Sequence, residues 1–265
     1  MTTLQLNRLP PLDAHAHLPT TTTSDLCEVH ACVLAMAISL EEASLTSTHT
    51  HPHIAWGVGC HPRQSRSQAS FDVNVFLDVA KNRAIVGEIG LDAGSRVPLS
   101  RQLHTFRSVL SVVADMPRIL SIHSYRATGL VLKELQRIPV AAPILHWWTG
   151  TASETSEAVE LGCFFSIHSA VARHSKFRTR VPPERILVES DHGYRDPPAA
   201  IACRIEWVEH LVAKQLGLDV ANIRELMWRN LARIAGETET ENLLPTRFAA
   251  ILTTLEGPRD TPRLL

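Results

Sequence analysis

The chain has 265 residues, of which 45% are hydrophobic and 20% are charged, so it contains enough apolar material for the core of one large domain. Its formal net charge is −1 at pH 7. Proteins that coat long stretches of nucleic acid usually carry a large excess of positive charge, so this balance disfavours extended nonspecific binding to DNA. Binding of a single phosphate or of a short strand end remains compatible with it.

The cysteines indicate a reducing compartment. Their number is odd and no two of them form a CxxC pair, which favours free thiols over a disulfide framework. They are Cys27, Cys32, Cys60, Cys163 and Cys203. Residues 1–11 contain no long apolar run, and the longest apolar stretch, residues 31–38, is too short to span a bilayer. We therefore expect a cytoplasmic protein that is not associated with a membrane.

Short apolar runs alternate with helical patterns along the chain. Helices are expected over residues 73–82, 99–114, 126–137, 153–161, 199–216 and 219–235. The apolar runs read as strands that end in polar residues, near residues 13–17, 36–39 and 59–61 and then at Glu88, His123, His146, Ser166 and Asp191. Eight strands that alternate with helices predict a parallel sheet covered on both faces.

The positions of the reactive residues favour a closed barrel over an open sheet. These residues follow strands one, four, five, six and eight, whereas an open doubly wound sheet would gather its ligands at one crevice. The sequence therefore predicts an α/β fold with a TIM-type (β/α)8 barrel as a single domain over residues 9–236. Residues 237–265 are expected to form a C-terminal extension that is partly helical and then poorly ordered.

The segment Asp13-Ala14-His15-Ala16-His17 places two imidazoles two residues apart on the first predicted strand. Side chains alternate across a strand, so His15 and His17 share one face and can bind the same metal ion. Asp13 lies on that face too and is expected to orient one of the ligands.

Four further strand ends supply candidate ligands. Glu88 lies in VGEIGLD, His123 in LSIHS, His146 in ILHWWTG and Asp191 in ILVESD, each directly after an apolar run where an unpaired polar group is costly. Together the six residues offer nitrogen and oxygen donors without thiolates. Such a set is typical of a catalytic site for two divalent ions, either zinc, magnesium or manganese.

The motifs DAHAHL, GVGCHP, VGEIGLD, SIHS, HWWTG and ESD together resemble those of the TatD family of metal-dependent deoxyribonucleases. The resemblance covers about residues 11–235, including Gln102, Phe106, Asn230 and Arg233. It implies that His15, His17, Glu88 and Asp191 hold one metal ion, and that Glu88, His123 and His146 hold the second.

The same resemblance implies hydrolysis of phosphodiester bonds in DNA, which for this neutral chain we expect at single-stranded or frayed ends. Two metal ions would activate a water molecule and neutralise the developing charge. Glu88 would bridge the ions, and Asp191 would take a proton from the water.

The chain departs from the family pattern at two places. The usual H-x-R-D-A reads His123-Ser124-Tyr125-Arg126-Ala127 here, and a small residue and proline after Asp191 are replaced by His192 and Gly193. These details also resemble the TatD homologue of Qat anti-phage defence operons. That narrower resemblance implies protein partners encoded in a defence operon.

Several other residues are candidates for contact with the substrate, namely His61, Arg63, Arg126, Trp147 and His192. At least one of Trp147 and Trp148 is expected to pack in the core. His49, His51 and His53 precede the third strand, which places them at the end of the barrel opposite the catalytic face. Cys60 is expected to pack rather than react.

Two other functions are consistent with parts of this pattern. A metal-dependent amidohydrolase that acts on a small molecule also begins with His-x-His, although many such enzymes bridge their metals with a carboxylated lysine, and no lysine ends a strand here. A TatD-like subunit that is active only inside a protein complex is the second alternative, which the altered H-x-R-D-A motif keeps open.

Overall fold

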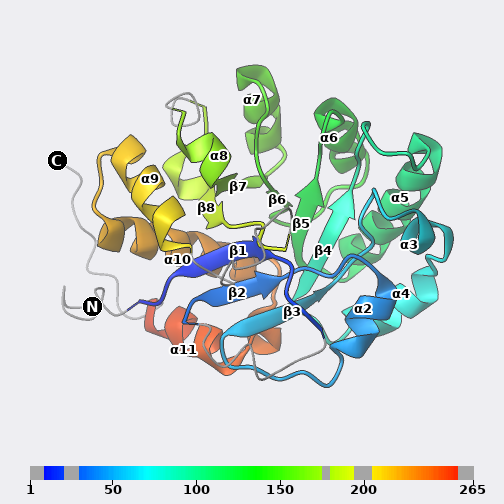
Figure 1. Cartoon of the computed structure of the whole chain (residues 1–265), viewed down its shortest axis with the longest axis horizontal. Coiled ribbons are helices and arrows are strands. Elements are labelled where there is room, and N and C mark those ends of the chain that lie inside the picture. Colours follow the sequence, from blue (N-terminus) through cyan, green and yellow to red (C-terminus); the bar gives the residue numbers. More distant parts are fainter. Residues whose placement is uncertain (1–8, 21–29, 175–179, 194–204, 256–265) are drawn as a thin grey trace.

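The computed structural model describes residues 9–20, 30–174, 180–193 and 205–255. Its centre is a sheet of eight parallel strands in the order in which they occur along the chain. The strands are β1 (Leu12–Ala16), β2 (Cys32–Ala35), β3 (Ile54–Val58), β4 (Ile85–Gly90), β5 (Ile119–His123), β6 (Ile144–Leu145), β7 (Phe164–His168) and β8 (Ile186–Glu189). Figure 1 shows this sheet with helices arranged around it.

The first and last strands meet, which turns the sheet into a nearly closed barrel. The amide of His17 donates to the carbonyl of His192 at 2.7 Å, and the amide of Asp191 donates to the carbonyl of His15 at 3.0 Å. Ala16 and His192 also form a parallel bridge. The prediction of a single-domain (β/α)8 barrel is therefore confirmed.

The longer helices agree with the sequence pattern. They are α4 (Val73–Ala80), α5 (Leu99–Asp115), α6 (Thr128–Arg137), α7 (Ala152–Glu160), α9 (Glu206–Leu216) and α10 (Val220–Glu237). Each presents apolar residues at helical spacing to the strands, as Phe106, Val109 and Val113 do on α5. The predicted start of the helix over residues 199–216 lies outside the described residues.

Three short helices, α2 (Leu40–Leu45), α3 (Ser65–Ala69) and α8 (Ser169–Ala172), were not expected from the sequence. They are too short to show a helical period. Strand β2 ends at Ala35, one residue before the predicted range, although the amide of Met36 still donates to the carbonyl of Ala16 at 2.8 Å.

Helix α10 positions both strands of the barrel seam, β1 and β8, near the points where they begin. The indole of Trp228 donates to the carbonyl of Pro10 at 2.8 Å, directly before β1. The side-chain amide of Asn230 donates to the carbonyls of Pro183 and Ile186 at 2.9 and 2.7 Å, at the start of β8. One helix therefore positions the two strands that carry His15 and lead to Asp191.

The C-terminal extension packs against the barrel. A single-turn helix η2 (Glu241–Leu243) leads into helix α11 (Thr246–Leu255), drawn in red in Figure 1. The ring of Phe248 lies 5.6 Å from the ring of Trp228 on α10. The amide of Arg247 donates to the carbonyl of Pro52, just before β3. This helix thus packs near the end of the barrel where the strands begin; residues 256–265 lie outside the described residues.

Cys32, Cys60 and Cys163 are free and buried, which agrees with the predicted packing role of Cys60. Burial raises the pKa of each of these thiols to about 12. Cys27 and Cys203 lie outside the described residues. Among the helices that the structure describes, none combines the length and apolar character needed to cross a membrane.

Replacement of Phe248 by alanine tests the packing of α11. Phe248 is fully buried, so its truncation is expected to lower the free energy of unfolding by about 3 to 5 kcal/mol. The exposed Thr254→Ala on the same helix should change it by less than about 0.5 kcal/mol. Denaturant unfolding of both variants checks this, and equal effects would show that α11 contributes little to the core.

Candidate metal centre

All six predicted ligands meet at the end of the barrel where the strands finish. His15 lies on β1 and His17 directly after it, Glu88 on β4, and His123 at the end of β5. His146 follows β6 and Asp191 follows β8. Five of the six, all but the fully buried His15, line a pocket of about 330 Å³.

One group of donor atoms surrounds the Oε2 oxygen of Glu88. The Nε2 atoms of His15 and His17 lie 3.3 Å apart, and they lie 3.6 and 3.1 Å from this oxygen. The Oδ1 oxygen of Asp191 lies 3.6 Å from Nε2 of His15 and 3.7 Å from Nε2 of His17. Two imidazoles and two carboxylates therefore converge on one point.

A second group surrounds the other oxygen of the same carboxylate. Nδ1 of His123 lies 2.6 Å and Nε2 of His146 lies 2.9 Å from Oε1 of Glu88. The two imidazole nitrogens are 3.2 Å apart. Glu88 thus presents one oxygen to each group of histidines.

Hydrogen bonds at the far side of two rings direct their lone pairs into the centre. Nδ1 of His15 lies 2.7 Å from the hydroxyl of Ser121, and Nε2 of His123 lies 3.1 Å from Oδ2 of Asp92. When these outer nitrogens carry the protons, Nε2 of His15 and Nδ1 of His123 are left as acceptors that can bind a metal. Sequence reasoning assigned no role to Ser121 or Asp92.

A loop held by Gln102 keeps Asp92 in place. The Gln102 side chain accepts from the amide of Asp92 at 2.7 Å and donates to the carbonyls of Asp92 and Val97 at 3.0 and 2.8 Å. The same loop starts at Gly90, the last residue of β4, where glycine is required because φ is 128° and a Cβ atom would collide with the carbonyl oxygen of His123. Gln102 therefore acts on the site through the loop that carries Asp92.

Asp13 positions the Asp191 segment instead of an imidazole. Its carboxylate accepts from the amide and hydroxyl of Ser190 at 3.0 and 2.5 Å, and from the amide of His15 at 3.3 Å. Asp191 itself has φ 48°, a backbone conformation that costs energy in a residue with a side chain. Asp13 was expected to orient one of the ligands, and its oxygens, occupied by backbone and hydroxyl donors, hold the segment of Asp191 at the β1–β8 junction.

Glu189 is a second acidic residue that the sequence analysis did not single out. It is fully buried on β8, where its Oε2 accepts a short hydrogen bond from Ser166. Its Oε1 lies 3.7 Å from Nδ1 of His146, and both of these atoms are buried without a hydrogen-bond partner. Glu189 is therefore the nearest charged neighbour of the outer edge of the His146 ring.

The charges in the centre are strongly coupled. Burial, followed by the neighbouring His146, lowers the pKa of His15 to about 3, so its ring is neutral at pH 7. Burial raises the pKa of Asp191 to about 7. Burial would also raise the pKa of Glu88, but the surrounding imidazoles outweigh it and hold that pKa well below its usual value.

The donor set fits divalent metal ions. Ligand atoms arranged tetrahedrally around zinc at its usual bond lengths lie about 3.3 Å apart, which is close to the separations found here. Two neutral imidazole nitrogens at 3.3 Å gain nothing from each other unless a proton or a cation lies between them. The Oδ1 oxygen of Asp191 is buried and has no hydrogen-bond donor. A cation would satisfy both of these features.

The predicted substrate contacts His61 and Arg63 line the same pocket. Nδ1 of His61 accepts from the amide of Arg63 at 3.0 Å, which leaves the proton on Nε2. That Nε2 lies 3.2 Å from Oε2 of Glu88. His61 therefore faces the centre as a hydrogen-bond donor rather than as a ligand.

The other predicted contacts are placed differently. Trp147 lines the pocket, whereas Trp148 is buried and donates to Thr155 at 3.1 Å, so one tryptophan packs in the core as expected. Arg126 and His192 are not among the residues that line the pocket. The guanidinium of Arg126 lies over the ring of Tyr125, and Tyr125 takes the place at the pocket wall.

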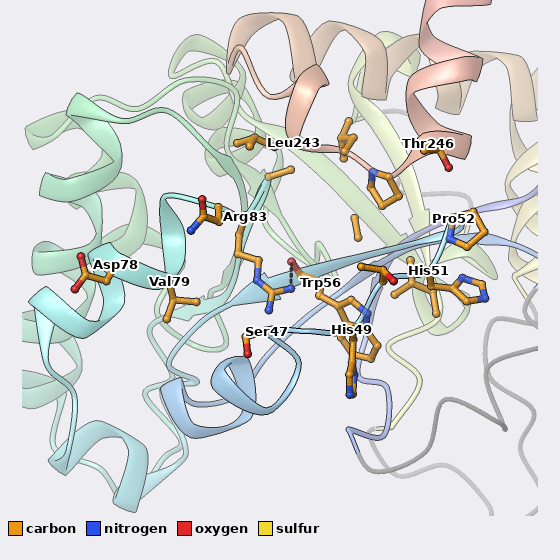
Figure 2. A pocket seen from close by; sticks show the side chains of 17 residues that line it. Ser47, His49, His51, Pro52, Trp56, Asp78, Val79, Arg83, Leu243 and Thr246 are labelled. Atoms are coloured by element: carbon orange, nitrogen blue, oxygen red, sulfur yellow. Dashed lines mark hydrogen bonds between the residues drawn. The ribbon is translucent and has the colours of Figure 1, made fainter.

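His49 and His51 lie at the opposite end of the barrel, as predicted. They line a separate pocket of about 720 Å³, shown in Figure 2, together with Trp56, Arg83 and Leu243. The guanidinium of Arg83 donates to the carbonyl of Trp56 at 3.4 Å. None of the six predicted ligands lines this pocket.

Replacement of Asp92 by asparagine tests the alignment of His123. An amide NH2 group facing Nε2 would force the ring proton onto Nδ1 and so block the ligand atom. We expect the affinity for Zn²⁺ to fall by about 10- to 100-fold. Competition with a chelator measures this, with the exposed Asp78→Asn as control. Unchanged affinity in Asp92→Asn would contradict the proposed orientation of the ring.

Comparisons with known proteins agree with this geometry. A family model described as TatD related DNase matches residues 12–236. The 3'-5' ssDNA/RNA exonuclease TatD of Klebsiella pneumoniae is 25% identical over 70% of this chain and 77% of its own length. Among solved structures, the TatD homologue YJJV of Escherichia coli superposes with a TM-score of 0.71 at 17% identity, covering 84% of this chain and 97% of that one. A TatD family hydrolase of Entamoeba histolytica gives 0.68 at 12% identity, covering 85% and 97%. The chain therefore belongs to the TatD related DNase family and is a metal-dependent hydrolase.

Proposed function

We propose that the chain hydrolyses phosphodiester bonds of single-stranded DNA, at or near strand ends, with two divalent ions. The observation that carries this proposal is the position of Glu88. Each of its two carboxylate oxygens lies within 3.2 Å of an imidazole nitrogen from a different pair of histidines. A carboxylate shared in this way supports two ions side by side, which suits displacement at phosphorus.

Zinc, magnesium or manganese held by these residues would polarise the phosphoryl oxygens and make the attacking water more acidic. Asp191 is suited to accept the proton of that water, since its carboxylate lies at the edge of the centre and Oδ1 has no hydrogen-bond donor. Glu88 fixes the spacing of the two ligand groups. The backbone contacts of Asp191 with β1 hold its carboxylate at the edge of the centre.

The pocket wall supplies groups that can hold a phosphate. Nε2–H of His61 points at the centre, and Arg63 is partly exposed at the rim, 3.6 Å from Asp92. Trp147 offers an aromatic edge for a base. Arg126 and His192 stay predictions as substrate contacts, with their side chains outside the pocket lining. A pocket of about 330 Å³ suits one nucleotide of a strand end better than a duplex.

The name of the Klebsiella relative specifies single-stranded DNA and RNA as substrates of that protein, which supports the choice of a single strand for this chain. A role in a Qat-type anti-phage system, with partners from a defence operon, rests on the resemblance of short sequence motifs alone. A cytoplasmic location rests on the cysteine pattern. Both are proposals. The amidohydrolase alternative is disfavoured because a glutamate, not a lysine, occupies the position between the two ligand groups.

Replacement of Glu88 by glutamine is expected to abolish hydrolysis of labelled single-stranded DNA in the presence of Mn²⁺, Mg²⁺ or Zn²⁺. The change keeps the shape of the side chain but removes the charge that both ligand groups share. Asp191→Asn is expected to lower the rate by at least about 100-fold through loss of the proton acceptor. Gel assays of timed samples measure both effects.

The control for these variants is Glu157→Gln, an exposed position on α7 that is not among the residues lining the pocket. It should keep the wild-type rate. Full activity of Glu88→Gln with a normal thermal unfolding curve would refute the two-metal proposal. Hydrolysis of a small amide or ester, with no cleavage of any nucleic acid by the wild-type protein, would favour the amidohydrolase instead.

A further inference from the structure

A second cleft adjoins the metal pocket and is lined by residues from the segments that follow β6 and β7. It is an open cleft of about 670 Å³. Trp147 and Thr149 line both this cleft and the metal pocket, so the two spaces meet across these residues. A molecule that extends beyond the metal pocket on this side would enter the cleft.

The wall between the two spaces is held in a fixed position. Trp147 has φ 44°, a conformation that is unfavourable for a bulky residue and persists only where the surroundings enforce it. Its ring stacks on the ring of His168 with centroids 3.8 Å apart. Nδ1 of His168 in turn accepts from the amide of Ala170 at 3.2 Å, which anchors that ring at the start of α8.

The cleft is positively charged although the whole chain is not. Arg173, His174 and Arg180 line it, and none of its described lining residues carries a carboxylate. Neither arginine forms an ion pair with a carboxylate among the residues that the structure describes. Arg180 donates to the carbonyl of Gly150 at 3.2 Å, which places its guanidinium beside the loop that carries Trp147. A chain with a net charge of −1 therefore still has a local basic surface next to the metal centre.

Guanidinium groups without carboxylate partners are well suited to phosphate oxygens. We propose that this cleft binds the nucleotides next to the scissile bond of a single-stranded nucleic acid, with Arg173 and Arg180 at their backbone phosphates. The proposal rests on the phosphodiesterase function and adds to it the surface that holds the strand outside the metal pocket. The two arginines determine specificity and do not touch the reacting atoms.

The test compares two substrates, bis(p-nitrophenyl) phosphate and a fluorescent oligothymidylate. The double variant Arg173→Ala, Arg180→Gln should hydrolyse the small diester at the wild-type rate. Its KM for the oligonucleotide should rise on the order of ten-fold at similar kcat, and the slope of log(kcat/KM) against log salt should fall by about 1.4, since each single-strand phosphate contact contributes about 0.7.

Two further variants make the result specific. Arg137 is an exposed arginine at the C-terminal end of α6, so Arg137→Ala removes one positive charge that is not part of the cleft. This variant should keep the wild-type kcat and KM for both substrates. Arg180→Lys, in the presence of Arg173, keeps the charge and should keep the salt dependence of the wild-type protein.

The outcomes separate this inference from the function on which it rests. An unchanged KM and salt slope in the double variant, with both substrates cleaved, would overturn the cleft proposal and leave the phosphodiesterase intact. Loss of both activities with normal metal content would also overturn it, because the arginines would then affect catalysis itself. If the wild-type protein cleaved neither substrate, the function would fail and the cleft proposal with it.

Discussion

A buried carboxylate that is surrounded by five imidazoles is the constraint on which the rest of the structure depends. Glu88 is almost completely buried, and a charge in that position is tolerable only if opposite charge or hydrogen-bond donors surround it. Histidines from β1, β5 and the end of β6, together with His61 after β3, all lie within 3.6 Å of its oxygens. The barrel must therefore bring segments that are distant in the sequence to one point, because a small displacement of these histidines would leave the buried charge without partners. The fold thus determines the geometry of the site.

The scaffold meets this requirement through contacts that lie away from the metal centre. Gln102 holds the loop of Asp92, and Asp92 sets the ring of His123. Asp13 holds Ser190, the neighbour of Asp191, and Asn230 on α10 fixes the start of the same strand. These contacts give Gln102 and Asn230, which lie on outer helices, a role in locating the strand ends that carry the candidate ligands.

The sequence predicted the fold and the convergence of the six candidate ligands because both depend on local signals. Each ligand directly follows an apolar run, and a strand end in a parallel barrel points to the catalytic face. Ser121 was missed, although it lies two residues before His123 on the same strand and so on the same face. Glu189 was missed too, although it ends β8 two residues before Asp191. For Ser121 that alternation was a signal that could have identified it, and for Glu189 the signal was a carboxylate at the end of an apolar run.

Other features had no local signal. The pairing of Asp92 with Gln102 spans an irregular loop, in which no periodicity indicates what will meet. Tyr125 lines the pocket and Arg126 does not, and this placement depends on a left-handed backbone at Arg126. The sequence around Arg126 does not predict that backbone conformation. The basic cleft beside Trp147 combines residues from two separate connections, so the overall charge of the chain gave no indication of it.

The central claim is that Glu88 joins two metal positions, and electron paramagnetic resonance of the Mn²⁺-loaded protein tests it most directly. Ions that share one carboxylate are magnetically coupled. The account predicts a coupled dinuclear spectrum at two Mn²⁺ per chain, and its replacement by the signal of isolated ions in Glu88→Gln. A spectrum of isolated Mn²⁺ alone in the wild-type protein at saturating metal would contradict it.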